Sequence, residues 1–386
     1  MQIARICQAM VSMTIVLFTL TTYGSTSLAG VAAFFSTFPG LIVSPIAGAL
    51  LDRHGRTRLV VLDYLVALAL LALIGVLALL GALPPWLIIV IAGAASLTAP
   101  LSATGLRSLF PLIVPSHLWE RINAIDSTGY IIATIFGPPL AGILVSYWGG
   151  AVAFIVIGVG FGVAAAVIGR TPDPGVQTIS QGHLLVDAWQ GLLYTLRNPT
   201  LRGLGVSISV LNVVTGTFNI VVPLLVLERF HHDATVVGLV FAMQGLAGIV
   251  SAFFFGRIDS RNREWLMLVV PMLGHGVAAA LLLLKPVLPV LVAVLILIGL
   301  LSGPLDIALF TVRQRRTDRR WTGRAFAVSM SFNALGIPIG AFIAGVIAEV
   351  SIEKAIALAA VTSFAAGVLA AVMIPATERS SSDLLR

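Results

Sequence analysis

Charged residues are scarce in this sequence. Asp, Glu, Lys and Arg make up only 10% of the 386 residues, whereas 58% are hydrophobic. Soluble domains carry about 25% charged residues, because polar side chains must cover the surface that faces water. A chain with so little charge cannot build such a surface. Its composition excludes an ordinary soluble protein and indicates an integral membrane protein.

Cysteine is nearly absent. The single Cys7 excludes an internal disulfide framework and a metal site built from cysteines. The chain also lacks a phosphate-binding loop and any arrangement of a nucleophile with a base. His231, His232 and Asp233 stand together, but no further ligand accompanies them, and we interpret them as a solvated loop. We predict a protein that is not an enzyme and has no cofactor and no metal site.

Long apolar runs, in contrast, occur throughout the chain. A helix needs about 20 apolar residues to cross roughly 30 Å of hydrocarbon, and lipid leaves no partner for free backbone groups. We therefore predict an all-α integral membrane protein with 12 transmembrane helices. The first run is too long for a signal peptide and lacks a cleavage site, although the start codon could lie upstream. The predicted spans are 3–22, 27–50, 59–81, 86–106, 122–146, 150–169, 203–227, 235–256, 265–284, 287–311, 325–348 and 354–375.

The basic residues are distributed unevenly between the links. Of the 23 Lys and Arg, only Arg229, Lys285 and Lys354 fall after odd-numbered spans. Basic loops remain on the cytoplasmic side. We therefore predict a multi-pass protein of the cell's inner or plasma membrane with both termini in the cytoplasm. The net charge of +7 is then a topology signal, and we predict no binding to nucleic acid.

The sequence repeats itself weakly. Residues 121–142 and 324–345 align without gaps at an offset of 203, and Gly137 and Gly142 match Gly340 and Gly345. Parallel repeats are typical of transporters whose substrate site lies between two halves. We predict an N-terminal six-helix bundle (1–169), a linker with an amphipathic helix on the cytoplasmic membrane face (170–202), a C-terminal six-helix bundle (203–375) and a cytoplasmic tail (376–386).

The first bundle contains a cluster of charge between its second and third spans, GALLDRHGRTRLV. This segment resembles the signature loop of the major facilitator superfamily. The matching residues are Gly48, Asp52, Arg53, Gly55 and Arg56. The resemblance implies the major facilitator fold, with two pseudo-symmetric six-helix bundles. The links at 106–127 and 311–330 resemble the exporter branch that contains enterobactin and macrolide efflux proteins.

The fifth span provides a second resemblance. Its sequence GPPLAG is similar to the Gly-rich fifth helix of drug and proton antiporters, with Ala141 in place of one glycine. The matching residues are Gly129, Gly137, Pro138 and Gly142. Glycine allows helices to approach closely and proline interrupts the hydrogen-bond ladder, so we expect a kink at a moving interface.

The charged loop implies a gate. In the superfamily, the aspartate at Asp52 meets the N-terminal end of helix eleven when the transporter faces outward. A helix N-terminus stabilises a carboxylate by about 0.3–1 kcal/mol, and Arg324 would add a full positive charge. Arg56 would then pair with Asp126 or Glu120, whereas we interpret Arg53 as a topology anchor.

Ionisable residues within spans are costly and need a reason. Asp306 lies seven residues before Arg313, about 10 Å into the tenth span. It could carry a proton or pair with Arg313, and the sequence leaves both open. Asp126 could belong to the same network, or pair with Arg107, Arg56 or Arg121. The candidates for a proton or charge network are Asp306, Asp126, Arg107 and Arg324. We interpret Asp63 and His275 as structural.

The resemblance also implies a central cavity. Its candidate lining residues are Asn212, Asn219, Gln244, Asn333 and Tyr130. A mostly apolar cavity with scattered amides suits an amphipathic ligand. We predict a monomeric, proton-coupled exporter of amphipathic small molecules, such as drugs or siderophore-like compounds, that works by alternating access in the lipid bilayer. The alternatives are an uptake permease of the same fold and a non-transporting sensor or scaffold.

Overall fold

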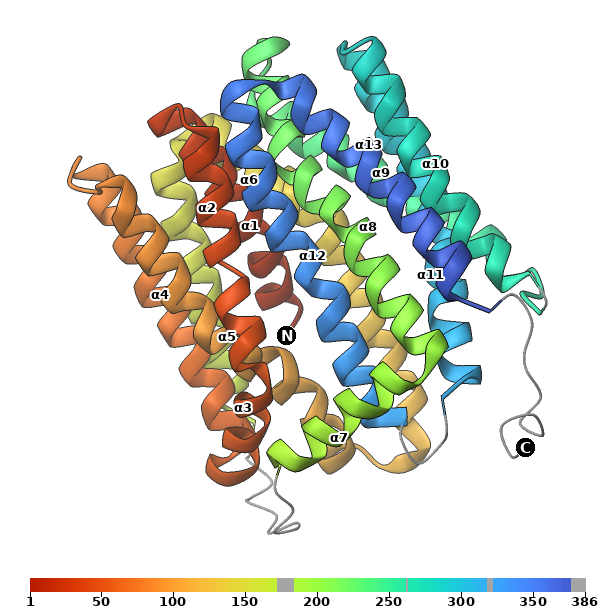
Figure 1. Cartoon of the computed structure of the whole chain (residues 1–386). Coiled ribbons are helices and arrows are strands. Elements are labelled where there is room, and N and C mark those ends of the chain that lie inside the picture. The colour runs from red at the N-terminus through yellow and green to blue at the C-terminus, as the bar shows by residue number, and fades with distance from the viewer. Residues whose placement is uncertain (172–183, 262, 318–321, 376–386) are drawn as a thin grey trace, which may run out of the picture.

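The computed structural model describes residues 1–171, 184–261, 263–317 and 322–375, and these ranges contain helices but no strand (Figure 1). The all-α prediction is thereby confirmed. The helices are α1 (Gln2–Tyr23), α2 (Thr26–Phe35), α3 (Phe38–His54), α4 (Arg56–Leu79), α5 (Pro85–Ile113), η1 (Ser116–Leu118), α6 (Trp119–Ile168), α7 (Leu184–Arg197), α8 (Pro199–Leu224), η2 (Leu225–Arg229), α9 (Ala234–Phe255), α10 (Glu264–Leu284), α11 (Leu288–Arg315), α12 (Thr322–Val350) and α13 (Ile352–Met373).

Three of the predicted spans do not correspond to one separate helix each. The described residues form eleven helices that are long and apolar enough to cross a membrane, because α6 joins the fifth and sixth predicted spans. Gly149 separates these two spans with a non-helical backbone (φ 80°, ψ 159°) that glycine adopts without a steric penalty. The predicted span 27–50 is instead two helices, α2 and α3. The second begins with Pro39 in its first turn, where the missing N–H costs no hydrogen bond.

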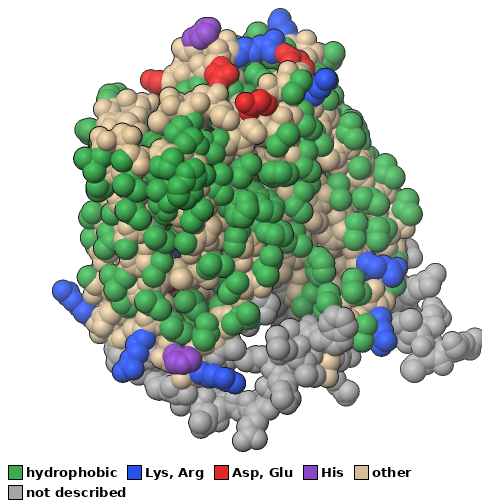
Figure 2. Space-filling model, turned by 60° about the vertical axis from the view of Figure 1, so that its left-hand side comes forward, with side chains coloured by type: hydrophobic (Ala, Val, Ile, Leu, Met, Phe, Trp, Pro, Cys, Tyr) green, Lys and Arg blue, Asp and Glu red, His purple; other side chains and the backbone are tan. Residues whose placement is uncertain are grey.

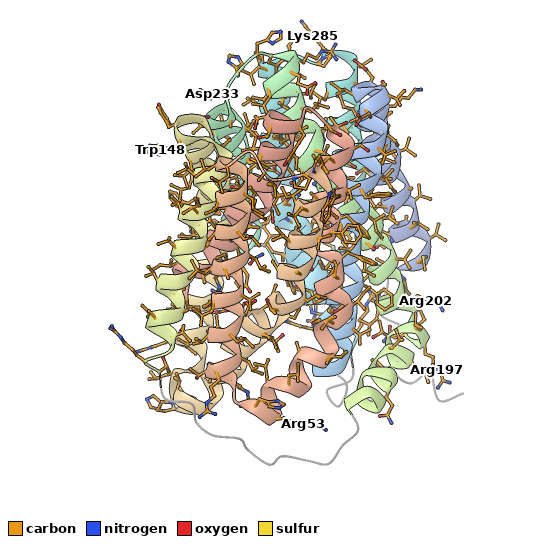
Figure 3. The ribbon with its side chains drawn as sticks, turned by 90° about the vertical axis from the view of Figure 1, so that its left-hand side faces the viewer. Arg53, Trp148, Arg197, Arg202, Asp233 and Lys285 are labelled. Carbon is orange, nitrogen blue, oxygen red and sulfur yellow. The ribbon has the colours of Figure 1, made fainter. Side chains whose placement is uncertain are left out.

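The surface divides into an apolar middle and two charged ends. Hydrophobic side chains cover the middle of the view in Figure 2, with charged groups above and below it. Figure 3 places Arg53, Arg197 and Arg202 at one end, which we call the basic end. It places Asp233 and Lys285 at the other end, which we call the opposite end. The uneven distribution of basic residues is thus a property of the folded molecule. Which end faces the cytoplasm stays a prediction.

The helices form two pseudo-symmetric bundles. In the first, α1 and α4 pack against α6, and in the second α8 packs against α12 and α10 against α13. Helix α7 agrees with the amphipathic helix expected in the linker, and it contacts α8 and α12 as well as α3. It lies across the basic end in Figure 1. The division of the chain at residues 169 and 203 stays a prediction.

Glycines of the sequence repeat make equivalent contacts. A Cβ on Gly137 would lie 2.5 Å from the Cβ of Ala9 on α1, and a Cβ on Gly340 would lie 2.7 Å from the Cα of Val213 on α8. Both contacts lie within one bundle. The second glycine pair instead makes contacts between the bundles, which join α6 to α9 and α12 to α2. The offset of 203 residues is therefore a repeat in three dimensions.

Candidate transport cavity

A cavity of about 420 Å³ lies between the bundles. Its walls come from α1 and α6 of the first bundle and from α8, α9, α10 and α11 of the second. The polar lining residues are Ser12, Thr134, Asn212, Thr215, Asn219, Gln244, His275, Ser302 and Asp306. None of the lining residues is Lys or Arg. Among the described residues, the cavity wall therefore contains one carboxylate and one imidazole but no Lys or Arg.

The two walls of the cavity differ in chemistry. The first bundle contributes apolar or small groups, including Ala9, Met13, Val16 and Pro138, with two hydroxyls. The second bundle contributes the amides, the imidazole and the carboxylate. A ligand between these walls would meet apolar groups on both sides, because the second bundle also contributes Leu211, Phe218 and Ile298, but it would meet amides and a carboxylate on one side only. This arrangement suits a molecule with one polar face.

Asp306 is exposed to this cavity although it lies inside a transmembrane helix. Its carboxylate has no ion-pair or hydrogen-bond partner among the residues that the structure describes. The pairing with Arg313 that the sequence left open is therefore not seen. Arg313 is fully buried, with Nη1 2.8 Å from the Sδ of Met330 and its guanidinium 5.8 Å from the ring of Phe310.

His275 also lines the cavity, which the sequence did not indicate. The imidazole is buried, and its Nδ1 lies 2.7 Å from the carbonyl oxygen of Pro271. Because a carbonyl can only accept, Nδ1 carries the proton and Nε2 is the nitrogen that can accept. The prediction of a hydrogen-bonded buried histidine thus agrees with the structure, but the same residue contributes to the cavity wall.

The predicted lining residues fall into two groups. Asn212, Asn219 and Gln244 line the cavity, whereas Asn333 and Tyr130 do not. Asn333 is buried behind the wall, where its backbone oxygen accepts from Nδ2 of Asn212 at 2.8 Å. With its amide turned, Asn333 Nδ2 donates to the backbone oxygen of Ser329 at 3.1 Å, and Asn333 Oδ1 accepts from Nη2 of Arg313 at 2.8 Å. Asn333 therefore fixes other side chains and does not face a ligand.

Asp126 has a partner that the sequence analysis missed. It forms an ion pair with Arg5 of α1, whose Nη1 also donates to the backbone oxygen of Asp126 at 2.5 Å. Both side chains are buried, and the Arg5 guanidinium lies 4.0 Å from the ring centre of Tyr130. Arg121, one of the three expected partners, is exposed. The available signal was that Arg5 is the only charged residue of α1.

The side chains of four predicted site residues lie outside the described residues. They are Gly48, Asp52, Arg107 and Arg324. The surrounding backbone is described: Gly55 joins α3 to α4 with φ 91°, a conformation that favours glycine, and Arg53 is exposed. Helix α3 contacts α12. The charged loop and the first turn of α12 therefore belong to helices that touch, as the gate requires.

The antiporter-like glycines of α6 serve close packing. Gly129 faces the side chain of Gln2, and Pro138 and Pro139 lie against Gly238 of α9. The backbone of α6 has helical torsions at both prolines, and its break lies at Gly149. The break at Gly149 is the junction between the fifth and sixth predicted spans, so the torsions show no interruption at the prolines themselves. Neighbouring helices can satisfy a backbone carbonyl that proline leaves unpaired.

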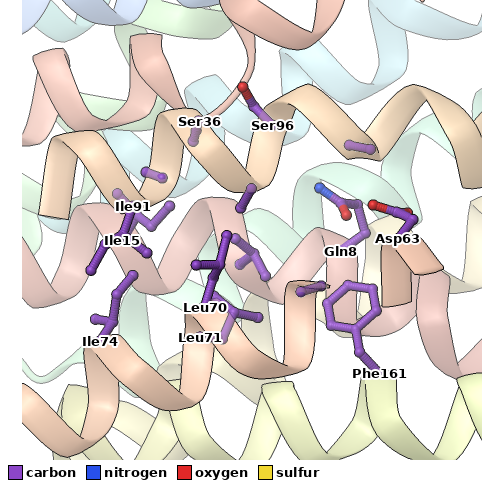
Figure 4. A pocket seen from close by; sticks show the side chains of 15 residues that line it. Gln8, Ile15, Ser36, Asp63, Leu70, Leu71, Ile74, Ile91, Ser96 and Phe161 are labelled. Atoms are coloured by element: carbon purple, nitrogen blue, oxygen red, sulfur yellow. The ribbon is translucent and has the colours of Figure 1, made fainter. Parts of the chain in front are cut away.

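A second cavity of about 40 Å³ lies inside the first bundle (Figure 4). Gln8 and Asp63 lie next to each other in its wall, beside Phe161. Asp63 is 4% exposed and faces the hydroxyls of Ser102 and Thr98. These contacts support the structural role that the sequence suggested for Asp63.

Comparison with known proteins identifies the family. The model of the Major Facilitator Superfamily matches residues 3–218 and 204–385. The chain belongs to this superfamily. It is therefore a membrane transporter and not an enzyme, and the predicted membership of this superfamily is confirmed.

Relatives in sequence include efflux proteins. The chain is 36% identical to an uncharacterised MFS-type transporter, y4rN, of Sinorhizobium fredii, over 95% of this chain and 91% of that protein. It is 25% identical to the multidrug efflux pump Tap of Mycobacterium bovis, over 92% and 86% of the two chains. It is 20% identical to macrolide efflux protein A of Streptococcus pyogenes, over 90% and 87%.

Solved structures share the fold. A mutant of the nucleoside transporter NupG has a TM-score of 0.80 at 12% identity, covering 97% of this chain and 98% of that one. A bacterial homologue of the iron transporter ferroportin, in an inward-facing state, has a TM-score of 0.70 at 15% identity, covering 96% and 95%. At these identities the likeness shows the fold alone.

Proposed function

We propose that this superfamily member is a proton-coupled exporter of amphipathic small molecules and works by alternating access as a monomer. The observation that carries the proposal is Asp306, a carboxylate exposed to a cavity between two pseudo-symmetric bundles and without a described partner. The efflux pumps among its relatives support the outward direction. The basic end would face the cytoplasm of a cell with an inner or plasma membrane.

The cavity favours a cationic or neutral substrate. Asp306 attracts positive charge, and the lining contains no Lys or Arg to attract an anion. Asn212, Asn219 and Gln244 provide amides for hydrogen bonds, while Met13 and Val16 face the apolar part of a ligand. Drugs that carry an amine on an apolar body fit this description better than anionic siderophores do.

Coupling follows from competition at one carboxylate. A cationic substrate is bound best when Asp306 is ionised, and a proton at Asp306 weakens that binding. Binding of a proton and of a cation are therefore linked with opposite sign. A proton that enters from outside would release the substrate there, and its departure to the cytoplasm would restore the binding site.

The experiment is a transport assay in proteoliposomes with an imposed pH gradient and a panel of amphipathic amines, neutral macrocycles and anionic catecholates. We expect substrate addition to release protons from the lumen. Asp306→Asn should abolish this proton flux but retain exchange of labelled substrate. The matched control is Asp259→Asn, because Asp259 is an exposed carboxylate outside the spans.

Three outcomes would contradict the proposal. Substrate flux in the same direction as protons would indicate an uptake permease, and silence across the panel with folded protein would indicate a sensor or scaffold. Proton-driven flux that persists in Asp306→Asn would remove Asp306 from coupling.

A further inference from the structure

The two bundles are joined at the opposite end by hydrogen bonds to the first turns of two helices. On α9, the backbone N–H of Thr235 donates to Oγ of Ser146 at 3.0 Å. On α2, the backbone N–H of Ser27 donates to Oε2 of Glu349 at 2.8 Å. Ser146 lies just before the break of α6 at Gly149 and Glu349 lies at the end of α12, whereas each donor lies in the first turn of a helix of the other bundle.

These two contacts are related by the internal repeat. Ser146 and Glu349 are separated by 203 residues, the offset that also relates Gly142 to Gly345. Each acceptor lies one turn beyond the glycine that touches the same partner helix. The repeat has therefore kept the position of the contact but changed its chemistry, from a hydroxyl in the first pair to a carboxylate in the second.

We expect the carboxylate to make the stronger contact of the two, although Glu349 is exposed. The first N–H groups of a helix have no partner within the helix and carry partial positive charge, so an anion is favoured there. Ser25 already accepts from Leu28, and Glu349 accepts from Ser27. The hydroxyl of Thr26 lies 3.1 Å from Glu349 and 3.0 Å from the carbonyl oxygen of Gly345, both on α12.

Close backbone packing supports the same contact. A Cβ on Gly30 would lie 2.6 Å from the carbonyl oxygen of Ala341 and 2.9 Å from the Cα of Gly345. Helices α2 and α12 thus touch through their backbones directly beneath the carboxylate. Any opening of the opposite end must separate these helices and withdraw Glu349 from the first turn of α2.

We propose that Glu349 is a positioning residue for transport, whose carboxylate holds the opposite end closed by capping α2 of the other bundle. The inference rests on the proposed alternating-access function. Glu349 makes its contact only while the opposite end is closed, and it does not touch the substrate cavity. It sets the balance between the two states of the transporter, with Ser146 as its weaker counterpart.

The chain provides a matched control for charge. Glu353 lies near the same end and pairs with Arg229 at 2.6 Å. Both residues belong to the second bundle, so their ion pair has no reason to break when the bundles separate. Glu353→Gln removes the same charge as Glu349→Gln without affecting a contact between bundles.

The test measures closure by disulfide formation between the bundles. Ser146→Cys and Thr235→Cys are introduced into a Cys7→Ser background, which removes the only native cysteine. Loss of a helix cap costs a factor of about three to ten in an equilibrium. We expect Glu349→Ala to lower the ratio of closed to open transporter by about three- to tenfold, and so to slow cross-linking by up to that factor, whereas Glu349→Gln should slow it less and Glu353→Gln should leave the rate unchanged.

A second variant removes the donor and keeps the charge. Ser27→Pro deletes the N–H that Glu349 accepts, and proline is tolerated in the first turn of a helix. It should slow cross-linking as Glu349→Ala does, and the double variant should be no slower than either single one. An unchanged rate in Glu349→Ala, or additive effects in the double variant, would overturn the proposal.

The readout separates this inference from the proposed function. Cross-linking requires neither a substrate nor a proton gradient. If Glu349→Ala slows cross-linking while no compound is transported, the proposed role of Glu349 is supported and the export proposal fails. If protons and substrate exchange normally but Glu349→Ala does not change the cross-linking rate, the proposed role of Glu349 fails and the export proposal is supported.

Discussion

Arg5 of α1 and Asp126 of α6 form a buried ion pair inside the first bundle, with the ring of Tyr130 against the guanidinium. The pair lies on the two helices that also meet where Gly137 faces Ala9. A buried charge is costly unless it is paired, so each partner depends on the other. The pair therefore holds α1 against α6. These two helices form the wall of the cavity that belongs to the first bundle.

Removing one partner should destabilise the protein strongly. Arg5→Met leaves the Asp126 carboxylate buried with its main cation gone, and we expect a loss of about 3–5 kcal/mol in the free energy of unfolding. The double variant Arg5→Met/Asp126→Asn should recover part of that loss. Unfolding in detergent micelles measures both. The control is Arg229→Gln, which removes an exposed pair worth about 0–1 kcal/mol. Equal losses in Arg5→Met and Arg229→Gln would contradict the assignment.

The sequence predicts the helices well and the side-chain partners poorly. Run length alone places the spans, because crossing the bilayer needs a minimum number of apolar residues. It does not show that α1 packs against α6, so the ion pair of Asp126 with Arg5 was not predicted. Run length also does not show that the helix containing His275 borders the cavity, so His275 was interpreted only as structural. Both omissions concern which helices touch, and hydropathy contains no information on that.

Alanine substitutions at the repeated glycines should distinguish residues that stabilise one bundle from residues that allow the two bundles to move. A Cβ on Gly345 would lie 2.6 Å from the backbone oxygen of Thr26 and 2.7 Å from the Cα of Gly30, across the bundle interface. Gly345→Ala should hinder closure of the opposite end, reducing transport at least about tenfold while changing the melting temperature little. Gly340→Ala should instead lower the melting temperature, because its contact with Val213 lies within one bundle.

Transport rates and melting curves for the two alanine variants check this distinction. Gly142→Ala should behave as Gly345→Ala does, because it faces the backbone of Ala234 in the other bundle. If Gly345→Ala and Gly340→Ala lower the melting temperature equally and leave transport unaffected, then the glycines serve general packing and not the interface between bundles.

Asp306 should discriminate ligands by charge. In Asp306→Asn we expect binding of a quaternary ammonium compound to weaken at least about 30-fold, because loss of one partner of an enclosed charge pair costs about 2–5 kcal/mol. A neutral compound of similar shape should bind within about threefold of the original affinity. Titration calorimetry in micelles measures both without a proton gradient. Equal weakening for the two ligands would mean that Asp306 shapes the cavity but does not recognise charge.

The loop between α3 and α4 should contain a gate at the basic end. Helix α3 ends at His54 and contacts α12, whose first residue is Thr322. A carboxylate at Asp52 would be stabilised at that helix N-terminus by about 0.3–1 kcal/mol, and by more if partly buried. Asp52→Asn should therefore reduce transport severely while membrane insertion stays normal. The control is Arg53→Gln, which changes an exposed charge beside it and should leave transport nearly unchanged. Initial rates are compared at equal amounts of inserted protein. Normal transport in Asp52→Asn would reduce the charged loop to a topology anchor and leave the opposite end, with Glu349, as the gated side of the molecule.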